Sequence, residues 1–88
     1  MDNIYKVNET FDFIEHNNGA IILFESEEKV FILTNIEKEI FNLIKEKKTL
    51  NDIVCELIKK YNAASEVIKN DVSYFIKKLL TADLIAKE

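Results

Sequence analysis

Few side chains in this sequence could do chemistry, and their spacing matches no catalytic or metal-binding pattern. The chain has one histidine, His16, and one cysteine, Cys55. A metal site needs several ligands at matched spacing, and the sequence offers no such set. The acids Glu25, Glu27 and Glu28 could serve as general acids or bases only in a desolvated pocket, which nothing near them indicates. We therefore expect no enzyme, no cofactor and no metal, and we favour a binding module.

Each of these side chains also has a simpler interpretation. His16 stands directly before a turn-like segment, and we interpret it as a solvated residue beside that turn rather than as a ligand. Cys55 has aliphatic neighbours and no adjacent basic residue that would lower the pKa of its thiol, so we expect a buried, unreactive cysteine. The acidic run Glu25–Glu28 is interpreted as a solvated loop that improves solubility.

The composition is typical of one small globular domain. The chain has 88 residues, of which 48% are hydrophobic, so we expect a single domain over residues 1–88 with residues 1–10 as an extended lead-in. No apolar run is long enough to span a membrane, and the first residues lack the apolar segment of a signal peptide. We therefore expect a cytoplasmic protein without a membrane-spanning segment.

The charged residues are unevenly distributed along the chain. Residues 1–44 carry three lysines against nine acids, whereas residues 45–88 carry nine lysines against seven acids. The chain contains no arginine at all. Because lysine is a poorer bidentate partner for phosphate or carboxylate than arginine, a recognition surface built on paired charges is disfavoured.

Three runs with strand character occupy the first part of the chain, at Phe11–His16, Ala20 to about Glu25 and Lys29–Leu33. Asn18-Gly19 between the first two predicts a hairpin with a type I′ turn, which needs positive φ at both central residues. Short connections predict an antiparallel meander with the third strand at an edge, where it could accept another strand. The last two runs do not alternate apolar with polar residues, so we expect cover on both of their faces.

Three helical stripes follow, each after a capping residue. Thr34 with Glu37 fits a capping box, Thr49 is a second cap and Ser65 a third. Apolar residues then recur at helical spacing between residues 36 and 44, 50 and 61, and 68 and 79. Leu84 and Ile85 are expected to return to the core. The sequence thus predicts an α+β fold, with a three-stranded antiparallel sheet followed by three α-helices.

Several short motifs, which follow one another over residues 19–85, resemble those of a known family. They comprise Ile22-Leu23, Phe31-Ile32-Leu33-Thr34, Ile40-Phe41, Thr49-Leu50-Asn51-Asp52-Ile53, and Asp71-Val72 with Phe75-Ile76 and Leu79. In this order and spacing they resemble the PqqD-like family, the RiPP precursor peptide recognition elements. Two positions depart from the family pattern: Thr34 replaces an asparagine that caps the first helix, and Asp83 stands where glycine is usual.

The resemblance implies a stand-alone winged-helix-like domain that acts in natural product biosynthesis. Such domains bind the leader region of a ribosomally made precursor peptide and present it to a maturation enzyme. In the family the leader adds a strand beside the third strand and lies in a groove against the third helix, a mode called β-augmentation. The residues implied to bind peptide are Lys29, Val30, Phe31, Ile32 and Leu33 on the strand, and Val67, Asp71, Tyr74, Phe75 and Lys78 on the helix.

Alternatives stay open for single residues on the third helix. Tyr74 is either an anchor for an apolar side chain of the peptide or an ordinary half-buried surface tyrosine. Asp71 either contacts the peptide or makes a structural hydrogen bond within its helix. Lys69 and Lys78 could attract an acidic leader, although isolated surface charges contribute little.

Two other functions suit the same pattern. A winged-helix DNA-binding regulator is favoured by the basic second half, but the acidic Glu25–Glu28 turn and the lack of arginine oppose contact with phosphates. A small adaptor could instead pair its open strand edge with a second copy, forming a homodimer. The sequence does not choose the maturation enzyme, so a leader peptidase, a radical enzyme and a cyclodehydratase all stay open.

Overall fold

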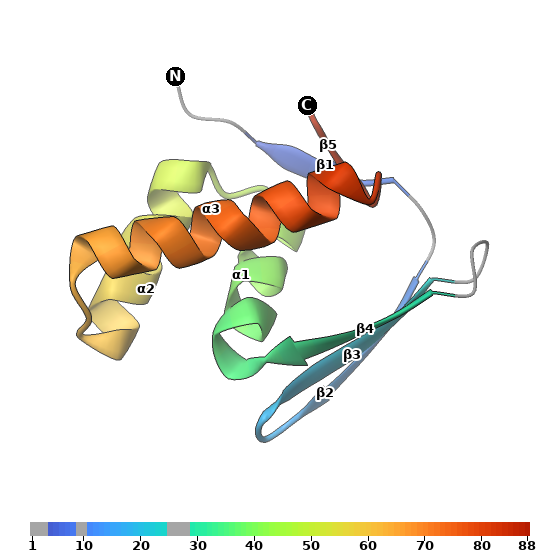
Figure 1. Cartoon of the computed structure of the whole chain (residues 1–88), viewed down its shortest axis with the longest axis horizontal. Helices are drawn as coiled ribbons and strands as arrows, with labels where there is room; N and C mark the ends of the chain where they lie inside the picture. Colours follow the sequence, from blue (N-terminus) through green and yellow to red (C-terminus); the bar gives the residue numbers. More distant parts are fainter. Residues whose placement is uncertain (1–3, 9–10, 25–28) are drawn as a thin grey trace.

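The computed structural model describes residues 4–8, 11–24 and 29–88. Its elements in chain order are β1 (Tyr5–Val7), β2 (Phe11–His16), β3 (Gly19–Phe24), β4 (Lys29–Thr34), α1 (Asn35–Lys45), α2 (Leu50–Tyr61), α3 (Ser65–Thr81) and β5 (Ile85–Lys87). The antiparallel sheet β2-β3-β4 and the three helices after it confirm the predicted α+β fold (Figure 1).

The β2–β3 hairpin forms as predicted, but its turn differs from the expected one. His16 pairs with Gly19, so the two turn residues are Asn17 and Asn18, and neither has a positive φ. The predicted type I′ turn is therefore wrong. The glycine is needed instead at the first position of β3, where its φ is 156° and an added Cβ would lie 1.9 Å from the carbonyl oxygen of Leu33.

Two of the three predicted helix caps are confirmed. Thr34 forms a full capping box, in which its backbone N–H donates to Glu37 Oε1 at 3.0 Å. Thr49 forms the same arrangement with Asp52. The third prediction is wrong, because α3 begins at Ser65 itself and the extended residue before it, Ala64, makes no side-chain cap.

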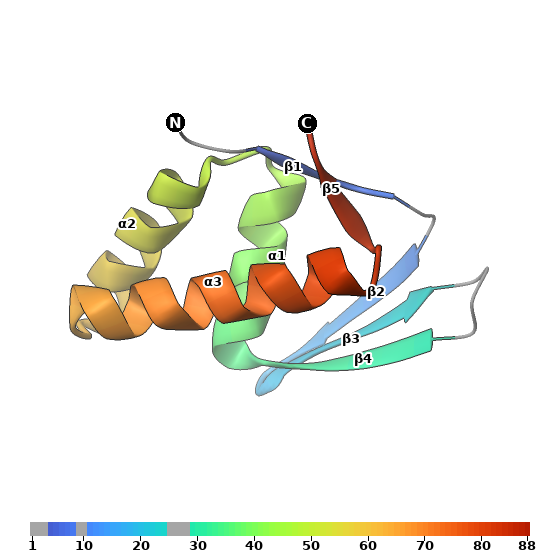
Figure 2. The same cartoon turned by 45° about the horizontal axis from the view of Figure 1, so that its top comes forward.

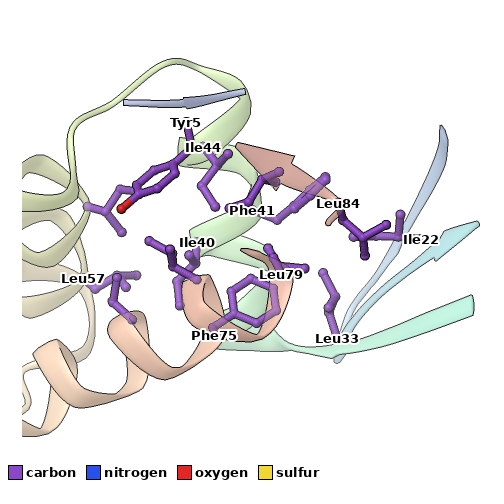
Figure 3. Packing of buried hydrophobic residues seen from close by; sticks show 14 of the residues in the cluster. Tyr5, Ile22, Leu33, Ile40, Phe41, Ile44, Leu57, Phe75, Leu79 and Leu84 are labelled. Carbon is purple, nitrogen blue, oxygen red and sulfur yellow. The ribbon is translucent and has the colours of Figure 1, made fainter. Parts of the chain in front are cut away.

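The hydrophobic core lies between the helices and one face of the sheet (Figure 3). The sheet contributes Ala20, Ile22, Phe24 and Leu33, all buried, and α1 packs against both β3 and β4. In both views the helices stand on one side of this sheet (Figure 2). The other side of the sheet is therefore left without a helix.

A second, two-stranded sheet closes the core at the chain ends, and the sequence pattern did not predict it. β1 and β5 pair antiparallel, with Tyr5 opposite Lys87 and Val7 opposite Ile85. Leu84 and Ile85 are buried, as predicted. Asp83 turns the chain between α3 and β5 with a φ of 62°, so an aspartate adopts the left-handed conformation at the family's usual glycine position.

The prediction of a buried Cys55 is wrong, because the structure exposes this thiol. On α2 the buried stripe consists of Ile53, Val54 and Leu57. One residue advances a helix by about 100°, so the position after Val54 turns away from the core. The aliphatic neighbours in sequence thus lie on a different face of the helix.

Replacement of Gly19 by alanine should destabilise the fold, because the new Cβ would meet the backbone of β4. We expect the free energy of unfolding to fall by about 2 kcal/mol or more for Gly19→Ala. Denaturant unfolding followed by circular dichroism measures the change. Asn17→Ala, in the exposed turn, is the control and should change the stability by less than about 0.5 kcal/mol; equal effects would contradict the close approach.

Candidate functional site

The outer edge of β4 has no strand partner among the described residues. The sheet order is β2-β3-β4, and β4 pairs only with β3, from Phe24 opposite Lys29 to Gly19 opposite Thr34. In an antiparallel strand every second residue directs its backbone N–H and C=O away from its neighbour. β4 therefore presents a row of backbone donors and acceptors on the side that faces away from β3.

Side chains on β4 alternate between the core and solvent. Leu33 is 3% exposed and Phe31 is partly buried, whereas Val30 and Ile32 are 59% and 76% exposed. The expectation that both faces of this run are covered is therefore wrong, because the helices lie on one side of the sheet only. Of Lys29, the structure describes the backbone pairing with Phe24.

α3 places a partly polar flank on the side of β4. Phe75 and Leu79 of α3 share the core with Leu33 of β4, and Figure 3 shows them pointing toward Leu33. Asp71 and Lys78 stand four residues before and three residues after Phe75, so they lie on the same side of the helix. Both are exposed. We call Val67, Asp71, Tyr74 and Lys78 the α3 flank.

Tyr74 is the most prominent side chain of the α3 flank. It is 71% exposed, more than the half-buried tyrosine weighed from the sequence, and Val67, seven residues or about two helical turns earlier, is exposed too. No side-chain hydrogen bond of Asp71 is present among the described residues, so its structural alternative gains no support. The side chains of Tyr74 and Asp71 are therefore both exposed and available to a ligand.

A hollow of about 390 Å³ lies at the C-terminal end of this flank, lined by Tyr74, Lys77, Lys78, Thr81 and Ala82. No acid lines it, and its walls combine an aromatic ring with two ammonium groups. The sequence reasoning missed Lys77, Thr81 and Ala82. Extension of the Tyr74–Lys78 spacing by one more helical turn would have found Thr81 and Ala82.

The ten predicted site residues thus fall into two groups. Lys29, Val30, Phe31, Ile32 and Leu33 lie on the edge strand, and Val67, Asp71, Tyr74, Phe75 and Lys78 lie on α3. Phe75 is buried in the core, as is the Leu33 side chain, so these two support the site from beneath rather than facing solvent. For Leu33 the backbone is the part that lies on the strand edge.

The residues weighed for chemistry lie elsewhere. His16 is exposed beside the hairpin turn, where its Nδ1 accepts from the backbone N–H of Asn18 at 3.3 Å. Within residues 4–8, 11–24 and 29–88, no three or more His, Cys, Asp or Glu side chains are grouped so that they could hold a metal ion. The acidic run Glu25–Glu28 lies outside the described residues.

Other ionic contacts support the helices rather than the site. Lys60 of α2 donates to Glu39 Oε1 of α1 at 2.6 Å, and this hydrogen bond raises the pKa of the Lys60 ammonium. Lys47 and Glu88 form a second ion pair, which ties the end of α1 to the chain end after β5.

In the part of the chain that the structure describes, no helix is long and apolar enough to cross a membrane.

Fold and site together define a class of protein, namely a small α+β domain in which an open strand edge runs beside the exposed flank of a long helix. Residues 19–85 match the family described as coenzyme PQQ synthesis protein D (PqqD). Because the match spans more than half of the sequence, the chain belongs to the PqqD family. The family resemblance found in the sequence is confirmed.

A solved structure has the same fold. The structure of TbiB1 in complex with the TbiA(beta) leader peptide is similar with a TM-score of 0.81, over 91% of this chain and 93% of that chain. The two sequences are 19% identical, so this likeness concerns the fold. No curated protein matches the chain.

Proposed function

We propose that this protein binds the leader region of a ribosomally made precursor peptide by strand addition to β4 against α3, and presents it to a maturation enzyme. The observation that carries the proposal is the edge of β4, which has no partner strand within the described part of the chain and lies beside the exposed α3 flank. Membership of the PqqD family supports it. The solved TbiB1 structure, which has the same fold and is a complex with a leader peptide, supports it as well.

Strand addition suits a peptide partner that is recognised by only some of its side chains. The backbone groups of β4 would hold any extended segment, because main-chain hydrogen bonds do not depend on the side chains of the peptide. Selection then falls to alternate side chains of the peptide, which point to opposite faces of the extended sheet. One set would turn toward α3, where Tyr74 and Lys78 are exposed.

The hollow on α3 favours one kind of peptide side chain. Its volume of about 390 Å³ suits one large apolar residue, which could pack against the Tyr74 ring. Lys77 and Lys78 border it without a neighbouring acid in its lining, so a carboxylate next to the apolar anchor would be favoured. We therefore expect a leader in which an apolar or aromatic anchor stands beside an acidic residue.

We propose no catalysis for the protein itself, since its site offers a strand edge, a tyrosine and lysines rather than an acid–base pair or a nucleophile with its base. The structure adds no observation that favours DNA binding, and the absence of arginine from the sequence still opposes it. Pairing of β4 with a second copy would use the same edge, so a leader peptide should compete with it.

The proposal is tested by titrating the labelled protein with the leader of the precursor encoded beside its gene. Amide chemical shifts should change on residues 29–33 and 66–79, because these form the edge and the helix that the peptide would cover. Two-dimensional NMR provides the measurement, and residues of α2 serve as the internal reference. Shifts that gather elsewhere, or none at all, would refute leader binding at this site.

Tyr74→Ala should weaken leader binding about tenfold, the loss expected when an aromatic anchor is truncated. Tyr61→Ala is the matched control, because Tyr61 is also an exposed helical tyrosine (36%) but lies at the end of α2. Fluorescence anisotropy with a labelled leader gives both dissociation constants. A similar loss in both variants, or none in the first, would remove Tyr74 from the site.

A further inference from the structure

The backbone groups of β4 point alternately toward β3 and toward the edge that has no strand partner among the described residues, which we call the open edge. Two observations fix this alternation. The backbone N–H of Thr34 donates to Glu37 Oε1 at 3.0 Å and is thus engaged outside β3. The carbonyl oxygen of Leu33 lies against Gly19 of β3, where an added Cβ would come within 1.9 Å of it. The backbone of Leu33 therefore faces β3, and that of Thr34 faces the open edge.

Val30 and Ile32 share the backbone orientation of Thr34, because every second residue of an antiparallel strand directs its N–H and C=O groups the same way. Their side chains are 59% and 76% exposed, on the side of the sheet away from the helices. The residues of β4 that offer backbone groups to a leader are thus the same residues that expose aliphatic side chains. We call Val30 and Ile32 the outward pair.

The outward pair continues apolar rows that cross the sheet. Ile32 lies opposite Ile21, and Ile21 lies opposite Ile14. Val30 lies opposite Leu23 in the next row but one. Antiparallel sheets with one solvated face ordinarily carry polar side chains there. Side chains directly opposite each other in a sheet have Cβ atoms about 5 Å apart, and an aromatic beside a β-branched side chain is a favourable pair, so a strand added beside β4 would place alternate side chains against the outward pair.

We propose that the outward pair selects leaders with an aromatic or β-branched side chain at the two positions opposite Val30 and Ile32. This inference rests on the proposed strand addition and concerns the leader side chains that turn away from α3. The leader residue between those two positions turns to the other face of the sheet, where α3 would contact it as the apolar anchor. The acidic residue expected beside the anchor would then stand two positions from it, on the same face.

The leader is favoured over a second copy as the occupant because it would use both parts of the same residues. An added strand would bond to the backbone groups of Val30 and Ile32 and would also stand beside their side chains. A second copy packed flat on this face would contact the side chains alone and would leave those backbone groups without a protein partner.

The test replaces an apolar contact with a charge. Ile32→Lys changes the outward pair, and Ile14→Lys is the matched control, because it makes the same change at an exposed isoleucine on the same face, two strands from the open edge. The probe is the fluorescent leader of the precursor encoded beside the gene. We expect the affinity to fall about fivefold for Ile32→Lys and to change by less than about twofold for Ile14→Lys.

A glutamate scan of the leader separates side-chain selection from a general effect on the strand. Glutamate is placed at each leader position in turn, and we expect one position at which Ile32→Lys binds the altered leader more tightly than the original, because opposite charges attract when they lie opposite each other in a sheet. For Val30→Lys this position should lie two residues away, the spacing of one strand face. Ile14→Lys should show no such position.

Circular dichroism melting checks that each variant folds, and Ile32→Thr, which keeps a β-branched residue, should show a smaller loss in the same direction. Equal losses for Ile32→Lys and Ile14→Lys, or a scan without a rescuing position, would overturn the inference, while leader binding by the unchanged protein would leave the proposed function standing. Failure of the unchanged protein to bind the leader would instead overturn the proposed function. Dimers in sedimentation velocity that Ile32→Lys dissociates and the leader leaves intact would assign the outward pair to a second copy and overturn the leader as its occupant.

Discussion

One-sided packing of the sheet is the constraint on which the rest of this structure depends. Leu33 anchors β4 in the core that α3 lines with Phe75 and Leu79, and this fixes the edge strand beside the helix. The described residues form three helices, and all of them stand on the same side of the sheet. Among the described residues the outer edge of β4 is therefore left open beside α3, and the proposed strand addition follows from that arrangement.

The edge of β4 and the α3 flank would divide recognition of the leader between two kinds of contact. On the edge, backbone groups would supply affinity for an extended segment, and on the α3 flank Tyr74, Lys77 and Lys78 would select its side chains. A small domain could in this way hold an extended peptide through its backbone and still select among peptides by their side chains.

Much of the fold could be predicted because local sequence patterns determine where its strands and helices begin and end. Thr34 and Thr49 each carry a capping partner three residues later, and the strand and helix periods change where the structure changes. The features that were predicted wrongly or not at all depend on packing between segments far apart in the sequence. Gly19 is required by the approach of β4, not by the turn, and the β1–β5 pairing joins the two ends of the chain. Cover on both faces of the Lys29–Leu33 run was expected, but none of the described elements covers the solvent face, where Val30 and Ile32 are exposed. The edge of the candidate site followed from strand order, whereas the predicted α3 residues ended at Lys78, one helical turn short of Thr81 and Ala82 in the lining of the hollow.

Strand addition at β4 is tested most directly by the leader peptide itself, made with a single N-methyl group at each successive backbone nitrogen. N-methylation removes one donor and leaves the side chain in place. Because an added strand directs alternate N–H groups toward its neighbour, the account predicts that the dissociation constant rises about tenfold or more at every second position and changes little at the positions between. Loss of binding without this alternation, or no loss at any position, would contradict a leader held by the edge of β4.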